Sequence, residues 1–440
     1  MIRRLLPLFT ILATYLIIGA LYALYTPAWQ APDEPAHYNY IRQIVQGCCP
    51  FIAAGDWDSA YLERIKAAKF APDALEDRLD SMQYEDHQPP LYYALLTPVF
   101  ALAGGSLAAL RLASLILGTG GVIAAWVGGR IVFPAGRWLA ILAAGFVAFL
   151  PQYLAIMGSV NNDSLAVALS GGMLVWALRR LLQPEAPSRW WIAALLAGAA
   201  CLTKLTIYPI VIILGVAAVL AAWREGRRGL ALLREALPIA LITVLIAAPF
   251  WLTNLSRYGF PDVLAQAAHD RIVVGQPQTA DYIAAHGGMG WLADLTKTTF
   301  QSFWGQFGWM GIPMTETIYG GLLALTGIAY VGGVTGLIVF KAARRRIAPA
   351  LFVMGGALLV TAAAFAYYNT KFVQFQGRYL YPALVPLALV FAGGVGTWIA
   401  LLSGRWRGGR VVVASLLVVG LAAFALYVLL RIVLPGLRVN

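Results

Sequence analysis

Long apolar runs separated by shorter polar segments recur along nearly the whole chain. About 20 consecutive apolar residues are needed for a helix to cross a hydrocarbon core of about 30 Å. This pattern predicts eleven candidate spans, some of them short or interrupted by polar residues. They are Leu5–Thr26, Leu107–Ile131, Trp138–Met157, Ser164–Leu182, Trp190–Thr203, Leu205–Trp223, Leu237–Thr253, Ile318–Phe340, Ala348–Tyr368, Tyr379–Leu402 and Val411–Leu434.

Two of the connections between these spans are long, residues 27–90 and 254–316, and both fall on the same side of the predicted bundle. The connections on the other side are short and rich in arginine, as at residues 344–346. Because basic residues collect in cytoplasmic connections, the two long loops are expected outside. Three regions follow: residues 1–253 with the first outer loop, residues 254–316 as a second outer loop with aromatic interfacial helices, and residues 317–440 as C-terminal spans.

Composition supports the membrane assignment. Hydrophobic residues make up 60% of the chain and charged residues 12%, about half of what a soluble domain carries. The formal net charge of +12 comes from basic clusters between apolar runs, and this pattern indicates membrane orientation and no nucleic-acid partner. We therefore expect an all-α, multi-pass protein of the cell membrane that contacts membrane lipids.

The strongest candidate chemistry lies just after the first span, where Pro32 and Pro35 bracket Asp33 and Glu34. The prolines restrict the backbone on both sides and so fix the carboxylates at the membrane surface. A short helix from Pro35 would carry His37, with the two acids near its positive N-terminal end. The alternative interpretation is an acid that only caps this helix.

Other polar residues are expected at the same outer surface. They are His87, Arg111, Asp163, Lys204 and Arg378, with Tyr379 next to Arg378 and Trp304 among the aromatic residues of the second outer loop. An arginine or lysine at this depth usually meets an anion, although snorkelling to lipid phosphates is an alternative for Arg111. Aromatic rings such as Trp304 suit either stacking on sugars or anchoring at the interface.

These residue types suit one reaction in particular. The chain has no nucleotide-binding fingerprint, and a sugar on a polyprenyl phosphate is an activated donor that reaches the outer membrane face. Phosphate is already a good leaving group, so the reaction needs a base for the acceptor hydroxyl and cations for the departing charge. One fixed carboxylate as the base, with the cations Lys204 and Arg378, and with His87, on the donor phosphate, would give an inverting glycosyltransferase.

The acidic pair Asp33 and Glu34, the stretch from Pro89 to Tyr93 and the run from Leu110 to Ser114 resemble the GT-C superfamily of membrane glycosyltransferases, in the branch of protein O-mannosyltransferases and aminoarabinose transferases. Three fuller strings, Asp33 to His37, Gln88 to Tyr93 and Gly377 to Pro382, resemble more closely still a predicted glycosyltransferase family known as DUF2142. The resemblance implies a GT-C-like bundle of about 11 transmembrane helices with two large extracytoplasmic loops and a catalytic module in residues 1–253. It also implies that Asp33 is the catalytic base, that Glu34 assists it in binding sugar or acceptor, and that Arg111 binds phosphate.

The remaining expectations concern ligands and rival functions. Sugar or acceptor contacts are expected from His37, Asp163, Tyr379 and Trp304, and the acceptor is a glycan, a lipid or a protein. No cofactor is expected to be required, with a divalent metal on the outer carboxylates and histidines as the less favoured alternative. The rival functions are a transporter or flippase of lipid-linked saccharide, which would place polar groups near the bilayer midplane, and a scaffold subunit of an envelope complex.

Overall fold

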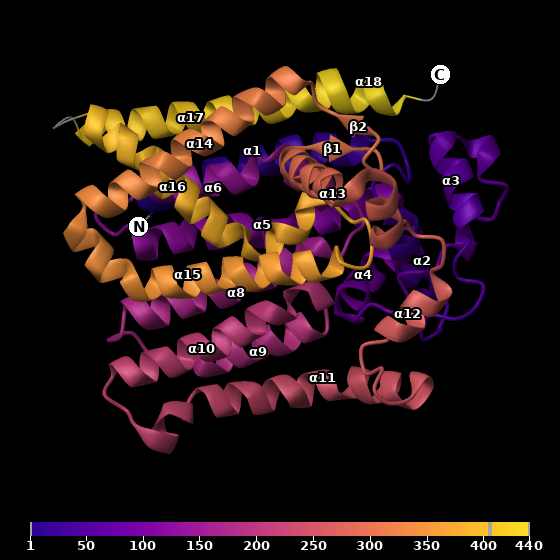
Figure 1. Cartoon of the computed structure of the whole chain (residues 1–440), viewed down its shortest axis with the longest axis horizontal. Coiled ribbons are helices and arrows are strands. Elements are labelled where there is room, and N and C mark those ends of the chain that lie inside the picture. Colours follow the sequence, from indigo (N-terminus) through magenta and orange to yellow (C-terminus); the bar gives the residue numbers. More distant parts are fainter. Residues whose placement is uncertain (1, 404–406, 439–440) are drawn as a thin grey trace.

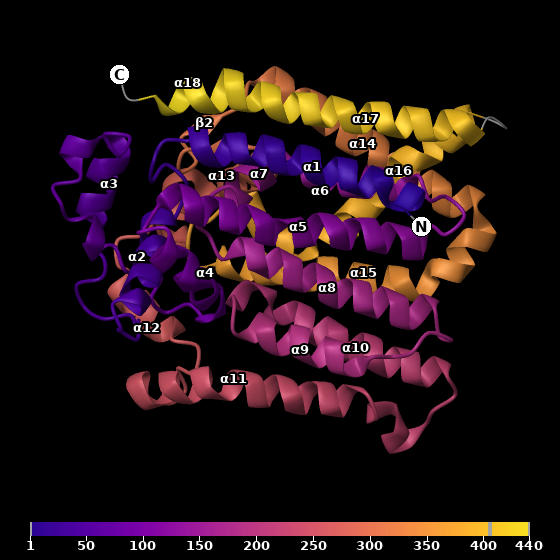
Figure 2. The same ribbon diagram turned by 180° about the vertical axis from the view of Figure 1, so that it is seen from behind.

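A computed structural model describes residues 2–403 and 407–438, and within them the chain forms a bundle of long, roughly parallel helices (Figures 1 and 2). In this part of the chain, nine helical segments are long and apolar enough to cross a membrane. They contain α1 (Ile2–Tyr25), α5 (Leu107–Val132), α8 (Asp163–Leu182), α10 (Tyr208–Arg224), α11 (Ala236–Tyr258), α14 (Glu316–Val339), α15 (Lys341–Tyr368), α16 (Leu384–Leu402) and α17 (Arg407–Val428).

Two predicted spans take a different form. The third is broken into α6 (Leu139–Ala148) and α7 (Pro151–Met157), which meet at an angle of 57° where Pro151 interrupts the helix. The fifth is α9 (Trp190–Cys201), whose 12 residues are too few to cross the hydrocarbon core alone. The prediction of eleven spans is therefore reached only if the bent pair and α9 are both counted with the nine full-length segments.

The shorter elements gather mainly at one end of the bundle, to the right in Figure 1. This end also carries both long loops, and it is opposite the end marked N. Its elements are α2 (Glu34–Val45), α3 (Ser59–Ala67), η1 (Pro72–Ala74), η2 (Leu79–Ser81), α4 (Leu91–Leu102), η3 (Leu205–Ile207), α12 (Gln266–Ile272), α13 (Thr279–Trp304), β1 (Gln306–Phe307), β2 (Ile312–Pro313) and η5 (Gly377–Ala383). Three further elements are η4 (Gly229–Leu233) between α10 and α11, and a π-helical turn (Leu429–Val433) and α18 (Leu434–Leu437) after α17.

Small residues let the membrane helices pack closely. A side chain at Gly394 of α16 would collide with the backbone of Ala329 on α14, and one at Gly332 would collide with Gly394 in return. The backbones of α14 and α16 are therefore in direct contact, the usual way in which helices associate without a hydrophobic driving force between them.

The two long loops form a small core of their own. Tyr61, Leu62 and Ile65 of α3 are buried together with Ala268 and Val273 from the second loop. A hydrogen bond of 2.6 Å from the Trp57 indole to the Val274 carbonyl joins the same two loops. This shared core holds the loops together over the end of the bundle and fixes the position of the residues between them.

Candidate active site

A cavity of ≈ 320 Å³ lies beneath the two long loops. Its walls come from the start of α2, the segment before α4, α12, η3, η5 and the end of α15. Of the residues expected at the site, it is lined by Asp33, His37, His87, Lys204, Arg378 and Tyr379. The sequence pattern therefore predicts most of the polar wall, although these residues are spread over more than three hundred positions.

Asp33 is held in place at the beginning of α2. Its backbone is left-handed, with φ of 67°, a conformation that aspartate and asparagine tolerate better than most residues. One carboxylate oxygen accepts a hydrogen bond of 3.1 Å from the Tyr84 hydroxyl, and the other accepts one of 2.5 Å from Arg378. Burial acts to raise the pKa of Asp33, but the charge and hydrogen bond of Arg378 outweigh it and leave that pKa below its ordinary value. Asp33 is therefore an ionised carboxylate.

Two cations line the cavity next to Asp33, and Asp163 connects them. The Lys204 ammonium lies 2.7 Å from one oxygen of Asp163, and the other oxygen lies 3.7 Å from Nη1 of Arg378. That Nη1 is buried and, among the residues that the structure describes, makes no hydrogen bond. Asp163 does not line the cavity, so it positions the two cations where we had expected a sugar contact. Arg378 thus retains N–H capacity for a further anion.

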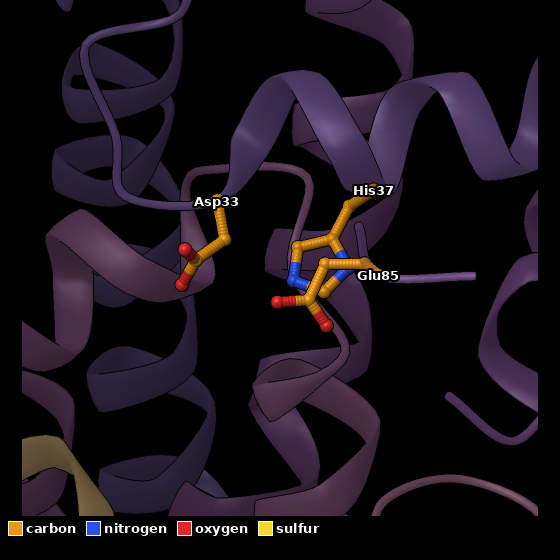
Figure 3. A group of neighbouring side chains, drawn as sticks. All are labelled: Asp33, His37 and Glu85. Atoms are coloured by element: carbon orange, nitrogen blue, oxygen red, sulfur yellow. The ribbon is translucent and has the colours of Figure 1, made fainter. Parts of the chain in front are cut away.

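His37 and Glu85 extend the wall on the other side of Asp33. One possible ligand atom from each of these three residues lies within 4.8 Å of the others, and Figure 3 shows the side chains converging. Nδ1 of His37 is 2.8 Å from the Tyr93 hydroxyl, which fixes the ring. Burial lowers the pKa of His37 to about 3, and burial together with the charge of Asp33 raises the pKa of Glu85 to about 7. A neutral imidazole and two carboxyl groups are suitable ligands for a divalent metal ion.

The second long loop, residues 254–316, contributes residues that the sequence did not single out. His269 and Asp270 of α12 line the cavity, and the His269 ring packs 4.3 Å from that of His87, centroid to centroid. The His87 ring is also fixed by a contact of 3.0 Å between its Nδ1 and the Tyr84 carbonyl. Burial lowers the pKa of His87 well below its ordinary value, and the neighbouring His269 lowers it further. A lowered pKa favours the uncharged imidazole, so the contact of His87 with the donor phosphate stays a prediction.

The structure corrects the roles expected of Glu34 and Arg111. Both carboxylate oxygens of Glu34 accept hydrogen bonds from Arg111, at 2.7 and 2.6 Å, and Glu34 has no exposed surface. The other Arg111 donors bond to the carbonyls of Ala23, Thr26 and Pro27. All five guanidinium N–H groups are thus used within the protein. The pair joins the C-terminal end of α1 to α2 and α5, and neither residue lines the cavity.

The structure also corrects the sugar or acceptor contact expected of Trp304. Trp304 ends α13, is only 3% exposed, and packs edge-on against Phe146 at 5.6 Å between ring centroids. Its ring therefore belongs to the hydrophobic core of the bundle and lies outside the cavity lining. Aromatic rings do line the cavity, but they come from Phe365, Tyr367 and Tyr368 at the end of α15 and from Tyr379 in η5. Tyr368 and Tyr379 meet edge to face at 5.8 Å, so two phenol rings form one corner of the cavity.

Comparison with known proteins gives an independent view of this arrangement. Residues 87–252 match the family model described as dolichyl-phosphate-mannose-protein mannosyltransferase. Among curated protein sequences there is no match.

Solved structures give matches over almost the whole chain. The fold is similar to that of ArnT from Cupriavidus metallidurans in the apo state, with a TM-score of 0.54 and 17% identity over 98% of this chain and 73% of that one. ArnT bound to undecaprenyl phosphate gives a TM-score of 0.50 and 16% identity, covering 98% and 74%. The archaeal oligosaccharyltransferase AglB from Archaeoglobus fulgidus, in complex with an inhibitory peptide and a dolichol-phosphate, gives 0.51 and 14%, covering 98% and 55%.

These matches establish the fold. The chain is an all-α, multi-pass membrane protein with the GT-C membrane fold of ArnT, as the resemblance of its sequence strings implied. It spans little more than half of the length of AglB. The narrower resemblance to DUF2142 stays a prediction.

Proposed function

We propose that this protein is an inverting glycosyltransferase that moves a sugar from a polyprenyl-phosphate-linked donor to an acceptor hydroxyl at the outer face of the cell membrane. One observation carries the proposal: the Asp33 carboxylate shares a cavity wall with Arg378 and Lys204 at the end of the bundle. A carboxylate base next to two cations is the set of groups that displacement of a phosphate by an alcohol requires. The match to a mannosyltransferase family and the fold shared with ArnT, which binds undecaprenyl phosphate, support it.

The geometry gives each residue a part in the reaction. The phosphate of the donor binds to Lys204 and Arg378, and an oxygen of Asp33 takes the proton of the acceptor hydroxyl. The acceptor oxygen then forms a bond to the anomeric carbon while the bond from that carbon to the phosphate oxygen breaks. The electron pair leaves with the lipid phosphate, whose charge the two cations hold. Attack from the face opposite the leaving group inverts the anomeric centre.

Donor binding also changes the state of the base. In the described structure Arg378 donates to Asp33 at 2.5 Å. A donor phosphate that binds to Arg378 competes for the same guanidinium and loosens this ion pair. The Asp33 carboxylate then becomes a stronger base when the donor is present, which limits proton transfer to the occupied site.

The acceptor side and the metal requirement complete the proposal. The acceptor, a glycan, lipid or protein, contacts His269 and Asp270, which the second loop contributes to the cavity wall. Catalysis needs no metal, because Lys204 and Arg378 already provide the charge that the leaving phosphate requires. Asp33, His37 and Glu85 are the residues that would hold a divalent ion in the alternative case.

The main rival is a transporter or flippase of lipid-linked saccharide. Such proteins bind their substrate near the bilayer midplane between paired broken helices. Here the cavity lies at the end of the bundle, and residues 2–403 and 407–438 contain one bent pair, α6 and α7. This position favours the enzyme.

A reconstituted assay separates the two functions. Purified protein in liposomes would receive a polyprenyl-phosphate donor with a labelled sugar, together with a membrane extract as the source of acceptor. The proposal predicts that label leaves the prenyl phosphate and appears in a new covalent product. Movement of intact donor between leaflets without bond cleavage would contradict it.

A further inference from the structure

A second large hollow lies at the opposite end of the bundle from the candidate active site. It is an apolar groove of ≈ 690 Å³ between α10, the segment with η4, the start of α11 and α15. Ile212, Val216, Val219 and Trp223 of α10 line one wall, and Phe352 of α15 lies across from them. Among the residues that line it there is no charged side chain.

The dimensions of this groove match one leaflet of a bilayer. It follows α10 from Trp223 to Ile212, which at 1.5 Å per residue is about 17 Å. Half of a hydrocarbon core of about 30 Å is about 15 Å. Trp223 lies next to Arg224, the last residue of α10, so the groove begins at the membrane surface and ends near the midplane.

The mouth of the groove is positively charged. The two carboxylates of the connection from α10 to α11 are already paired: Glu235 accepts two hydrogen bonds of 2.9 Å from Arg180, and Glu225 lies 2.9 Å from Arg227. Arg228 and Arg234 have no carboxylate partner in the described ranges 2–403 and 407–438. Nη1 of Arg228 donates to the Trp223 carbonyl at 3.2 Å, which places this guanidinium at the groove mouth.

A third arginine adds to the same mouth. Arg345 lies seven residues before Phe352 on α15, so the two side chains share one face of the helix. Arg345 is exposed near the helix start, two turns closer to the membrane surface than Phe352. The mouth thus combines the guanidinium groups of Arg228, Arg234 and Arg345, and guanidinium is the side-chain group best shaped to bind a phosphate with two hydrogen bonds.

We propose that this groove is a binding site for one anionic glycerophospholipid of the cytoplasmic leaflet. An acyl chain lies along α10 between α11 and α15, and the headgroup phosphate binds to the arginines at the mouth. The arginine-rich connections assign this end to the cytoplasm, where anionic lipids attract basic residues. The groove lies in the half of the bundle away from the Asp33 cavity, so the occupant is distinct from the glycosyl donor.

The chain offers a matched pair of variants for the test. Gly215 lines the groove, and a Cβ placed there meets no atom within 4 Å, so the side chain of Gly215→Leu begins in open space and extends into the groove. Gly420 of α17 also has open space around its Cβ and lies outside the groove lining, so Gly420→Leu is the control. Replacing a glycine inside a helix favours the helix in both variants, which keeps each protein folded.

Thermal unfolding in detergent would be measured with added dioleoylphosphatidylglycerol or dioleoylphosphatidylcholine at equal mole fraction. The anionic lipid should raise the Tm of the unmodified protein and of Gly420→Leu by more than the zwitterionic lipid does. Gly215→Leu should lose this difference. Arg228→Gln with Arg234→Gln should weaken apparent affinity for the anionic lipid about fivefold per arginine. Native mass spectrometry of protein extracted from membranes should show one bound phospholipid, absent in Gly215→Leu.

Three outcomes would overturn the proposal. Equal stabilisation by both lipids would show that the protein does not recognise the anionic headgroup. A full response in Gly215→Leu would place the lipid elsewhere on the surface. A bound mass that corresponds to a prenyl phosphate or to a second polypeptide would give the groove another occupant.

Discussion

Asp33→Asn is the most informative single change because the structure predicts separate effects on rate and on stability. The amide keeps the size of the side chain but cannot take a proton from the acceptor. General base catalysis contributes about 10²–10⁴-fold, so kcat should fall by that factor, about 3–5 kcal/mol in the activation barrier. The KM for the donor should change less, since Lys204 and Arg378 keep their positive charges.

The cost in stability should be small enough for the variant to fold. Asparagine tolerates the left-handed backbone at residue 33, where φ is 67°. Arg378 loses its ion pair with Asp33 but keeps a hydrogen bond of 2.8 Å to Gln376 and the charge of Asp163 at 3.7 Å. Complete loss of a partner by a buried charge costs about 3–5 kcal/mol. With these two contacts left, we expect about 1–3 kcal/mol, the cost of one unmet hydrogen bond.

The assay would follow label transfer from a polyprenyl-phosphate sugar by protein in liposomes, with Tm and yield measured on the same preparations. Asp73→Asn is the matched control, because Asp73 is an exposed acid of the same loop and lies outside the cavity lining. A folded Asp33→Asn variant whose kcat stays within about threefold of the unmodified enzyme would refute the assignment of Asp33 as the base.

The other predictions test the neighbouring residues. Arg111→Ala should lower the yield of folded protein, because it leaves the buried Glu34 carboxylate unpaired at a cost of about 3–5 kcal/mol. Fluorescence-detected size exclusion would measure this loss. A normal yield with a raised donor KM would favour phosphate binding by Arg111 instead. Lys204→Met should raise the donor KM about tenfold, the worth of one hydrogen bond to a charged group, with a smaller effect on the acceptor KM, and initial-rate kinetics would measure both. The raised pKa of Glu85, about 7, means that the folded state holds a proton that the unfolded chain releases at lower pH, so its contribution to stability is complete below pH 4.5 and is lost as pH rises through about 7. Glu85→Gln should remove this part of the fall in Tm with pH, and an unchanged profile would contradict the shift.

The sequence predicted the position of the candidate site better than the contacts that each of its residues makes. The position of Asp33 follows from two prolines and the end of the first span, which are local features that a sequence displays. The partner of Arg111 does not follow from the sequence, because the depth of an arginine in the membrane predicts only that some anion is near it. Adjacent residues of a helix start point in different directions, so Glu34 turned to Arg111 while Asp33 turned to Arg378.

Other misses have related physical causes. Several aromatic residues of the second loop alternate around α13, and the sequence alone does not tell which face of a helix meets the bundle, so Trp304 could not be separated from an exposed ring. His269 lies in a seven-residue helix without a recognisable motif. It reaches the cavity because the two long loops share a small core, a contact between distant segments that local pattern does not reveal.

The contacts of α18 have a consequence for biogenesis. The Gln30 amide donates to the Leu437 carbonyl at 3.2 Å, and the Lys69 ammonium donates to the Arg438 carbonyl at 2.8 Å. The loop that holds Asp33 thus contacts residue 437, which the ribosome adds 407 positions after Gln30. A nascent chain lacks these two contacts until it has been extended to residue 438, so this side of the candidate site is completed late in synthesis.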